Sequence, residues 1–246
     1  MKKFANKTVL VTGGSRGIGA AITQRLAQEG ANVAFTYHRS GEKAQAIATE
    51  INQAGGKAVA IKANSGVPDD VASAVKQTVK EFGGIDILVS NAGIYIGKAF
   101  EDHTLEEYEE IMSVNVRAVY VAALAAVKHM GAGGRIITIG SNMADNATGP
   151  QTTLYTMSKS ALQGFTRGLA RDLGPKKITV NLVQPGPIDT DMNPANTEFA
   201  NVMRSRTALA NYGTGDDVAG LVSFLAGDEG KFITGSALTI DGGFNA

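Results

Sequence analysis

Short runs of almost wholly apolar residues alternate along this chain with longer segments whose apolar residues recur every three or four positions. Runs that are apolar at nearly every position are typical of strands covered on both faces of a sheet, whereas the longer spacing predicts helices. The predicted strands are 7–12, 32–37, 57–63, 85–90, 134–140, 178–184 and 237–241, and the predicted helices are 17–29, 41–54, 68–82, 105–130, 154–173 and 215–227.

The regular alternation of strand and helix predicts an α/β fold. Strand–helix–strand units with right-handed crossovers build a doubly wound parallel sheet, here of about seven strands, with helices on both faces. No repeat, low-complexity stretch or polar linker interrupts residues 1–246, so we expect a single domain. The segment at about 185–213 is too long and irregular for an ordinary connection, and we interpret it as a substrate loop or lid.

Composition and charge narrow the function classes. Apolar residues make up 43% of the 246 residues and charged residues 19%, as in ordinary globular proteins. Lys+Arg and Asp+Glu both number 23, so no net charge favours a nucleic-acid polymer or an anionic membrane. The lack of cysteine excludes disulfides, thiolate zinc sites and thiol nucleophiles. Without a signal-peptide pattern or an uninterrupted apolar run near the roughly 18 residues of a membrane span, we expect a cytoplasmic protein without a membrane partner.

The first predicted strand leads into a glycine-rich turn, "TGGSRGIG" (12–19), that opens the first predicted helix. Glycine lets a phosphate approach the backbone closely, and a helix N-terminus offers free amides to a pyrophosphate. A glycine triplet alone would also suit a purely structural turn, but the strand–turn–helix–strand context favours dinucleotide binding. The residues of this turn that we expect to contact a cofactor are Gly13, Ser15, Arg16, Gly17, Ile18 and Gly19.

The end of the second predicted strand indicates which dinucleotide is bound. NAD sites usually carry an acid here for the ribose hydroxyls. This chain instead reads "TYHRS" (36–40), where Tyr37, Arg39 and Ser40 follow without a carboxylate. Arginine attracts a 2′-phosphate and binds it bidentately, and Arg16 can approach it from the glycine turn. The sequence therefore favours NADP(H), the alternative being that Arg39 is a solvated surface charge.

Further motifs follow in a fixed order. These are "NAG" (91–93) after the fourth predicted strand, Asn115 in "SVNVRAV", Ser141 after the fifth strand, Tyr155 with Lys159, and "QPGPIDT" (184–190) after the sixth. Together with the glycine turn, this set resembles the classical branch of the short-chain dehydrogenase/reductase family over nearly the whole chain. The resemblance implies one Rossmann domain with strand order 3-2-1-4-5-6-7.

The resemblance also implies a catalytic tetrad of Asn115, Ser141, Tyr155 and Lys159. A carbonyl oxygen needs a proton as hydride reaches its carbon, and the Tyr155 hydroxyl can supply it. Lys159 lies one helical turn away on the same face, where its ammonium is expected to lower the tyrosine pKa and, in the family, to hold the nicotinamide ribose. Ser141 can stabilise the developing charge. Asn115 resembles the residue that supports a water chain from the lysine.

Each of these residues, taken alone, would also suit a purely structural role. Ser141 would suit a helix cap, Asn115 a buried polar position, and Lys159 a lysine that snorkels beside a packed ring. We favour the active site because the motifs occur together and in order. The resemblance adds cofactor contacts by Asn64, Ser65, Asn91, Ala92 and Gly93, and by Pro185, Gly186, Ile188 and Thr190 around the nicotinamide.

Three positions depart from the family pattern. Asn64 stands where the family commonly has an aspartate facing the adenine amine, although an amide carbonyl accepts the same hydrogen bond. Ser90-Asn91 replaces a doubled asparagine, and "NLVQPG" replaces the usual "NAV" before the proline–glycine pair. The adenine contact is the one that these departures put most in doubt.

Several features are assigned no chemistry. His38, His103 and His129 have no metal-ligand spacing, and "EDHTLEEYEE" (101–110) suits a solvated helix start, so we expect no metal site. Asp189 and Asp191 flank Thr190 and are expected to organise the loop, magnesium binding being the alternative. The small-residue helices 106–130 and from Tyr155 onward pack against partner subunits in the family, which implies a homodimer or homotetramer.

The favoured function is NADPH-dependent reduction of a ketone or aldehyde to an alcohol, with the proton from Tyr155. The chain is similar to 3-oxoacyl-acyl-carrier-protein reductases, which does not fix its substrate. Residues 161–196 also resemble the cyclic-di-GMP-binding biofilm-dispersal proteins, so the alternative is a signalling protein that binds cyclic-di-GMP. A nucleic-acid-binding role is disfavoured by the zero net charge.

Overall fold

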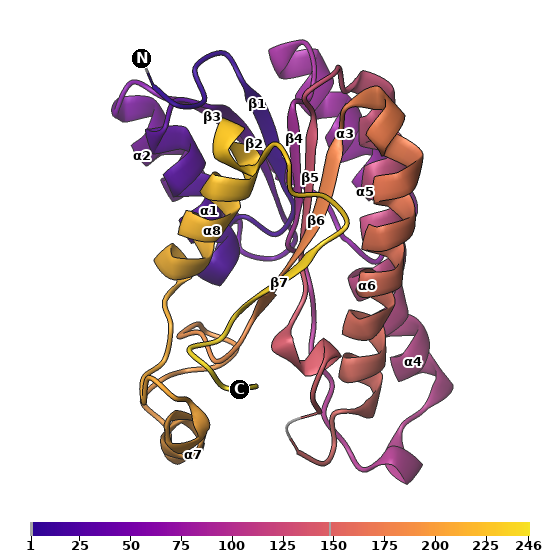
Figure 1. The fold of residues 1–246 in the computed structure, drawn as a ribbon. Coiled ribbons are helices and arrows are strands. Elements are labelled where there is room, and N and C mark those ends of the chain that lie inside the picture. Colours follow the sequence, from indigo (N-terminus) through magenta and orange to yellow (C-terminus); the bar gives the residue numbers. More distant parts are fainter. Residues whose placement is uncertain (1, 148) are drawn as a thin grey trace.

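The computed structural model describes residues 2–147 and 149–246, which form one α/β domain (Figure 1). All strand pairs are parallel, and the order β3-β2-β1-β4-β5-β6-β7 confirms the expected sheet. The strands are β1 (Thr8–Val11), β2 (Asn32–Tyr37), β3 (Lys57–Lys62), β4 (Ile87–Ser90), β5 (Arg135–Ile139), β6 (Thr179–Pro185) and β7 (Ala237–Ile240).

Helices cover both faces of the sheet, so the central strands are buried throughout, as their uninterrupted apolar runs predicted. The helices α1 and α8 pack together on one face beside α2, and α3, α5 and α6 lie on the other (Figure 1). The bounds are α1 (Gly17–Gln28), α2 (Gly41–Gln53), α3 (Pro68–Phe82), α4 (Leu105–Met112), α5 (Ala118–Ala126), α6 (Thr153–Leu173), α7 (Glu198–Arg206) and α8 (Gly215–Ala226).

The strand order reverses between β1 and β4. From β1 the chain moves outward to β2 and β3, then returns to place β4 on the other side of β1. The crossover helices diverge at that point and leave a crevice outside the carboxyl ends of the strands, which is where open α/β sheets bind ligands. The fold therefore directs attention to the segments that follow β1 to β6.

Two local features differ from the predicted elements. The helix expected at 105–130 is not a continuous α-helix, because a π turn at Ser113–Arg117 separates α4 from α5. Such turns are rare and frequent at functional sites, and this one contains Asn115. The irregular segment at 185–213 contains α7, which projects from the body of the domain (Figure 1). Its Thr197 caps the helix by accepting a hydrogen bond from the Ala200 amide at 3.1 Å.

Within the described residues, one helical run, Leu105–His129, is long and apolar enough to cross a membrane by length and composition alone, with a mean hydropathy of 1.5. Of the most apolar 18-residue stretch in this run, 44% is buried. One face of α5 packs into the hydrophobic core through Ala118, Ala122 and Ala126. The helix α5 therefore packs into the core on one face, while Tyr120 and Leu124 are exposed on the other.

Candidate active site

A cavity of about 690 Å³ follows the carboxyl ends of five adjacent strands, from β3 through β2, β1 and β4 to β5. At one end it is lined by Arg39 and Ser40, and at the other by Tyr155 and Lys159. Of the predicted site residues, those along this cavity are Gly13, Ser15, Arg16, Gly17, Ile18, Gly19, Tyr37, Arg39, Ser40, Asn64, Ser65, Asn91, Ala92, Gly93, Tyr155, Lys159 and Thr190.

The glycine turn after β1 requires its glycines for two different reasons. Gly13 and Gly17 have φ angles of +66° and +52°, a backbone conformation that side-chain-bearing residues rarely adopt. A Cβ atom on Gly19 would lie 2.2 Å from the Gly13 carbonyl oxygen and 2.5 Å from Nδ2 of Asn91. Asn91 braces the turn by donating hydrogen bonds from Nδ2 to the carbonyls of Thr12 and Gly13 at 3.0 and 3.1 Å.

The N-terminus of α1 has no side-chain cap, like those of α2, α3 and α6, whereas α4, α7 and α8 are each capped by a threonine. The helices α4 and α8 each begin with a capping box, formed by Thr104 with Glu107 and by Thr214 with Asp217. By contrast, α1 begins after Arg16 with no side-chain cap and no acid in its first turn. Its first amides and positive dipole end are thus available to an anion. This arrangement fits the pyrophosphate of a dinucleotide.

The other end of the cavity fits a 2′-phosphate better than a bare ribose. The residues that follow β2 along the cavity are His38, Arg39 and Ser40, without a carboxylate. Two acids line the cavity elsewhere, Glu110 and Asp191, and Asp191 is paired with Lys43 of α2 at 3.3 Å. The guanidinium of Arg39 therefore has no acid beside it at the end of β2, where NAD sites usually place one.

The expected adenine contact is only partly present. Asn64 lines the cavity, but its side-chain Oδ1 already accepts a hydrogen bond from the Gly66 backbone amide at 3.0 Å. The backbone amide of Asn64 donates to Oδ2 of Asp70 at 2.9 Å. An amide oxygen has a second lone pair, so it can still receive an adenine amine. Val67, which is 41% exposed, adds an apolar surface beside this turn.

Tyr155 and Lys159 lie one turn apart on α6 and meet at the far end of the cavity. The Ser141 side chain, which follows β5, hydrogen-bonds to the Tyr155 phenol. Lys159 is only 4% exposed, and its Nζ donates to the Ile139 carbonyl at 3.0 Å and lies 5.6 Å from the centroid of the Tyr155 ring. Lys159 is thus a buried cation that faces the ring, unlike a lysine that snorkels to the surface.

The direction of the tyrosine pKa differs from the one expected from sequence. Burial raises the pKa of Tyr155 to about 12, the Ser141 hydrogen bond opposes this, and the neighbouring Tyr95 adds to it. Burial also lowers the pKa of Lys159 to about 8. The expected lowering by Lys159 is wrong for this structure, because desolvation of the phenolate is the largest effect. Tyr155 therefore keeps its proton at neutral pH, as a proton donor requires.

Asn115 binds backbone rather than lining the cavity. It is 1% exposed, and it clamps Ile94 from both sides: Oδ1 accepts from the Ile94 amide at 2.9 Å, and Nδ2 donates to the Ile94 carbonyl at 3.0 Å. Nδ2 also donates to Oγ of Ser158 on α6 at 3.0 Å. A Cβ on Gly93 would lie 3.3 Å from Asn115 Oδ1 and 3.5 Å from Lys159 Nζ, so Gly93 separates the amide from the ammonium.

Ser141 is held by residues that the sequence did not single out. Gln184, fully buried at the end of β6, donates from Nε2 to the Ser141 carbonyl at 3.0 Å and to Asp145 Oδ2 at 2.8 Å. The Ser141 hydroxyl also accepts a hydrogen bond from the Met143 amide at 3.2 Å, so it is a cap as well as a partner of Tyr155. Near the C-terminus, Asn245 donates to the Asn142 carbonyl at 2.9 Å. The loop after β5 is thus fixed from two sides.

Of the four residues expected around the nicotinamide, only Thr190 lines the cavity. Pro185 ends β6, and Gly186 permits a close approach to β7, because a Cβ there would lie 2.4 Å from Cβ of Asp241. Ile188 is 5% exposed and belongs to the hydrophobic core. Pro185, Gly186 and Ile188 therefore support the loop without lining the cavity, while the Thr190 side chain lies beside Gly17 of the glycine turn.

The two acids that flank Thr190 organise the loop, as expected. Asp189 Oδ1 accepts a hydrogen bond from the Ala195 amide at 2.9 Å, and Asp191 pairs with Lys43.

The cavity is also lined by residues that were not predicted from the sequence. Most of them adjoin the predicted motifs, but Glu110, Ser113 and Val114 come from α4 and the π turn. The missed residues are Thr36, His38, Ala63, Gly66, Val67, Ile94, Glu110, Ser113, Val114, Ile139, Gly140, Asp191 and Met192.

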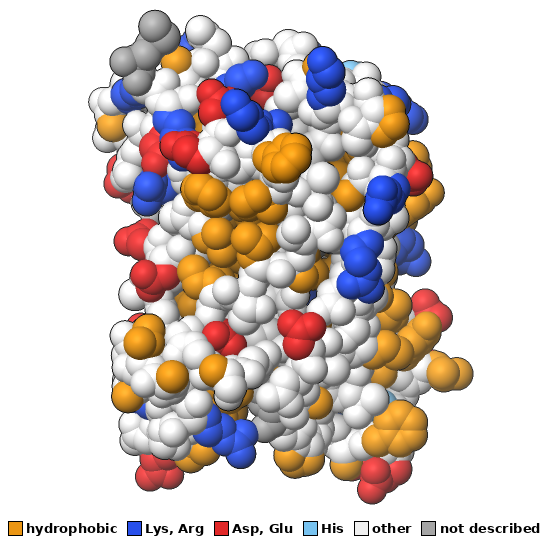
Figure 2. Space-filling view, in the orientation of Figure 1, with side chains coloured by type: hydrophobic (Ala, Val, Ile, Leu, Met, Phe, Trp, Pro, Cys, Tyr) orange, Lys and Arg blue, Asp and Glu red, His pale blue; other side chains and the backbone are white. Residues whose placement is uncertain are grey.

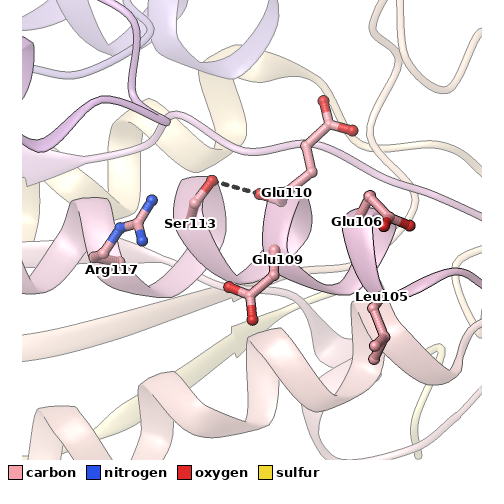
Figure 3. A pocket seen from close by; sticks show the side chains of 6 residues that line it. All are labelled: Leu105, Glu106, Glu109, Glu110, Ser113 and Arg117. Atoms are coloured by element: carbon pink, nitrogen blue, oxygen red, sulfur yellow. Dashed lines mark hydrogen bonds between the residues drawn. The ribbon is translucent and has the colours of Figure 1, made fainter.

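A second hollow, of about 450 Å³, lies along the outside of α4 (Figure 3). The side chains of Glu106, Glu109 and Glu110 project from α4, and that of Arg117 projects from the π turn that follows it. The Ser113 hydroxyl donates a hydrogen bond to the Glu110 carbonyl at 2.8 Å. It lacks the tyrosine, lysine and glycine turn of the first cavity. We therefore assign the candidate active site to the cavity along the strand ends.

Comparisons with known proteins agree with this geometry. A family model described as enoyl-(acyl carrier protein) reductase matches residues 13–245. The cyclic-di-GMP-binding biofilm dispersal mediator protein of Escherichia coli is 46% identical over 247 residues, covering 100% of both chains. Versicolorin reductase of Emericella nidulans is 41% identical and covers 98% of this chain and 96% of its own. A short-chain dehydrogenase from Burkholderia cenocepacia in complex with NADP is 53% identical, with a TM-score of 0.98 over 99% of this chain and 100% of that one.

Proposed function

This chain belongs to the short-chain dehydrogenase/reductase family, and we propose from that premise that it is an NADPH-dependent carbonyl reductase. The observation that carries the proposal is the cavity itself: its open helix end and basic end suit NADP(H), and it terminates at Tyr155, Lys159 and Ser141. Names of relatives support it, since one is a versicolorin reductase and a similar structure holds NADP.

The residues divide the reaction between them. NADPH held along this cavity, by the glycine turn at one part and Arg39 at another, would supply the hydride for the carbonyl carbon. Tyr155 donates its proton to the carbonyl oxygen, and Ser141 hydrogen-bonds to that oxygen as negative charge develops on it. Lys159 places a positive charge beside the phenolate that remains, and below its pKa of about 8 this charge is present. Asn115 is a positioning residue, because its hydrogen bonds fix the backbone of Ile94 beside the site.

The test of this function is a turnover assay. The protein is mixed with NADPH and a panel of ketones and aldehydes, including 3-oxoacyl thioesters and diketones, and the nicotinamide absorbance is followed. We expect oxidation of NADPH by wild-type protein and its loss in Tyr155→Phe, with NADPH binding retained. Absence of turnover across the panel in a protein that binds NADPH would contradict the proposal.

Cofactor choice has its own test. If Arg39 binds the 2′-phosphate, Arg39→Ala removes a charge-assisted contact of about 1.5–3 kcal/mol and weakens NADPH binding by about 10- to 100-fold. NADH lacks the phosphate, so its affinity should change little. The comparison requires Kd values for both dinucleotides with both proteins. Tighter binding of NADH than of NADPH by wild-type protein would overturn the assignment.

A second candidate function is cyclic-di-GMP binding. It is favoured by the 46% identity to a protein named for that activity. The discriminating measurement is calorimetric titration of cyclic-di-GMP with and without saturating NADPH. Micromolar or tighter binding without carbonyl turnover would favour a signalling protein, and competition with NADPH would assign both ligands to one cavity. The presence of Ser141, Tyr155 and Lys159 together keeps catalysis first.

We also propose a homodimer or homotetramer. Among the described residues, the exposed apolar side chains include Tyr120 and Leu124 of α5, at 54% and 49%, and Phe224 of α8 and Phe232 after it, at 40% and 98%. Figure 2 shows a hydrophobic patch over α8 and its connection to β7. Contiguous exposed apolar area of this kind marks interaction sites. Light scattering on wild type, Leu124→Lys and Phe224→Lys should show smaller assemblies for the variants, and a monomeric wild type would refute the proposal.

A further inference from the structure

Tyr95 lies beside the reacting end of the site through a chain of buried contacts. Asn115 clamps the amide and carbonyl of Ile94 at 2.9 and 3.0 Å, which fixes the direction in which the next residue leaves. Through Nδ2 and Ser158 the same asparagine is connected to α6, because Ser158 Oγ donates to the Tyr155 carbonyl at 2.7 Å. The position of Tyr95 relative to Tyr155 is therefore set by the buried framework of the site.

The Tyr95 ring itself is held by two contacts, and a glycine leaves space for it. Its centroid lies 5.2 Å from that of Tyr155, with the ring planes at 69°, the edge-to-face arrangement that aromatic pairs prefer. Its hydroxyl donates to the Gln151 carbonyl at 3.4 Å. Gly97 leaves room for the ring, because a Cβ there would lie 2.6 Å from the Tyr95 hydroxyl oxygen. A side chain fixed in this way presents a defined surface.

Tyr95 lies next to the cavity along the strand ends without being part of its lining. Gly93 and Ile94 line the cavity along the strand ends, but Tyr95 does not. It nevertheless touches Tyr155 and remains 46% exposed. A carbonyl compound bound at the Tyr155 hydroxyl must extend its substituents away from the cofactor, and Tyr95 is the large exposed side chain in contact with the Tyr155 ring.

The surroundings of Tyr95 in sequence are apolar or neutralised. Ile94 and Ile96 flank it, and the first charge that follows, Lys98, is paired with Glu107. The hydrogen bond to Lys98 is the largest of the causes that lower the pKa of Glu107 to about 2, so the carboxylate stays ionised and paired across the physiological range. An aromatic surface whose first following charge, Lys98, is already paired favours flat, uncharged groups.

We propose that Tyr95 is a substrate-positioning residue whose exposed ring receives a planar apolar group next to the reacting carbonyl. The substrate class that follows is aryl or conjugated ketones in preference to saturated ones. This inference rests on the proposed carbonyl reductase function. It goes beyond that function by assigning a recognition surface and a class of substrate to it.

The experiment compares matched pairs of ketones that differ only in a phenyl or a cyclohexyl group beside the carbonyl. Each pair is measured on wild type, Tyr95→Leu and Tyr95→Phe, with KM and kcat determined separately. Aromatic pairs are worth about 0.5–1.5 kcal/mol beyond their buried area, which corresponds to about 2- to 12-fold in affinity. We therefore expect Tyr95→Leu to raise KM for the phenyl ketones by about 3- to 10-fold, with KM for cyclohexyl ketones and kcat within about twofold.

Tyr95→Phe keeps the ring, so its ratio of phenyl to cyclohexyl KM values should equal that of wild type. If Tyr95 acted only through the hydrogen bond to Gln151, Tyr95→Phe would lose the preference as Tyr95→Leu does. An unchanged phenyl-to-cyclohexyl ratio in Tyr95→Leu, with wild type active, overturns this inference and leaves the reductase function standing. A wild type that binds NADPH but reduces neither ketone of any pair overturns the reductase function and the inference with it. Equal loss of kcat on both ketones would show that Tyr95 supports the fold rather than the substrate.

Discussion

The two ends of the substrate space are built in different ways. At the reacting end, Ser141, Tyr155 and Lys159 come from separate elements and are joined by buried contacts to β5, β6 and α6. The segment that follows β6 is held mainly within itself, for example by the hydrogen bond from the Ala195 amide to Asp189. In this segment Phe199 and Leu209 are 62% and 71% exposed, whereas Ile188, Ala200 and Tyr212 are buried. The reacting end is thus fixed by the core, and we propose that the segment after β6 contributes to substrate recognition from a more local framework.

This difference has a direct consequence for mutations. A change at the reacting end removes a group that several elements hold in place, so it should lower kcat. A change at an exposed side chain of 186–213, such as Phe199, should alter KM and leave kcat and global stability nearly constant, because such a side chain contributes little to the core. The predictions below test this division, beginning with the largest effect.

Among the residues that support Tyr155, replacement of Ser141 should have the largest effect. Ser141→Ala removes the hydroxyl that hydrogen-bonds to Tyr155, and loss of one such donor typically lowers kcat by about 10²- to 10³-fold. The substitution also removes the hydrogen bond from the Met143 amide, so Ser141→Thr serves as a control that keeps the hydroxyl. A Ser141→Ala enzyme with unchanged kcat would place this hydroxyl outside the reaction.

The pH dependence of kcat tests Lys159. Its pKa of about 8 means that the ammonium is present below pH 8 and lost above it. We expect kcat to fall by about tenfold between pH 7 and pH 9.5, because the phenolate formed by proton transfer loses the cation beside it. Lys159→Met should have a low kcat without this fall. A wild-type kcat that is constant to pH 9.5 would contradict the role of the ammonium.

The same lysine should affect stability in a defined window. From pH 8 to its ordinary pKa of 10.5, the unfolded chain holds the proton and the folded chain does not, so the free energy of unfolding rises with pH through this group. Tyr155 has the opposite effect above pH 10, because its pKa in the folded chain is raised to about 12. The folded chain then keeps a proton that the unfolded chain loses, so the free energy of unfolding falls with pH through this group. Urea unfolding of wild type and Lys159→Met from pH 7 to 10 measures the first effect, and parallel curves would contradict it.

Gln184 should have an intermediate effect. Gln184→Leu removes the hydrogen bonds to the Ser141 carbonyl and to Asp145 while keeping an apolar side chain of similar size in the core. We expect kcat to fall by about 3- to 10-fold with NADPH affinity unchanged, because the loop that carries Ser141 loses one of its supports. Gln184→Glu would keep an acceptor only, and its kcat should fall as well. Unaltered kcat in both variants would show that Ser141 is positioned without Gln184.

A matched pair of helix caps should give the smallest effects. Thr197→Ala removes the cap of α7, and Thr214→Ala removes the cap of α8 in the core layer. Each change costs about 1 kcal/mol of helix stability. The first should raise KM by about 2- to 5-fold without a change in Tm, whereas the second should lower Tm by about 2–4 °C without a change in KM. The reverse assignment would refute the contrast between the two regions.

Much of the framework could be predicted because its signals are local. Short, mostly apolar runs located the seven strands of the described sheet, the glycine turn was found from its spacing, and Tyr155 with Lys159 follow from the pitch of one helix. The order of the motifs then indicated a family whose sheet order the structure confirms.

The features that escaped prediction depend on contacts between distant segments. Gln184 and Ser141 are 43 residues apart, and nothing in "NLVQPG" shows that the glutamine faces the loop after β5. The π turn around Asn115 leaves the apolar pattern of its helix almost unchanged. The pKa of Tyr155 was expected to be lowered because the nearby lysine is visible in the sequence, whereas the burial that outweighs it is not.

The most direct test of the central claim is a single-turnover transfer experiment. Wild type and Tyr155→Phe are saturated with NADPH that carries deuterium at the transferable C4 position, mixed with a ketone, and quenched at intervals. We predict deuterium on the carbinol carbon of the product, with transfer in Tyr155→Phe slowed by at least about 10²-fold at unchanged NADPH affinity. Transfer at the wild-type rate in the variant would contradict the assignment of Tyr155 as the proton donor.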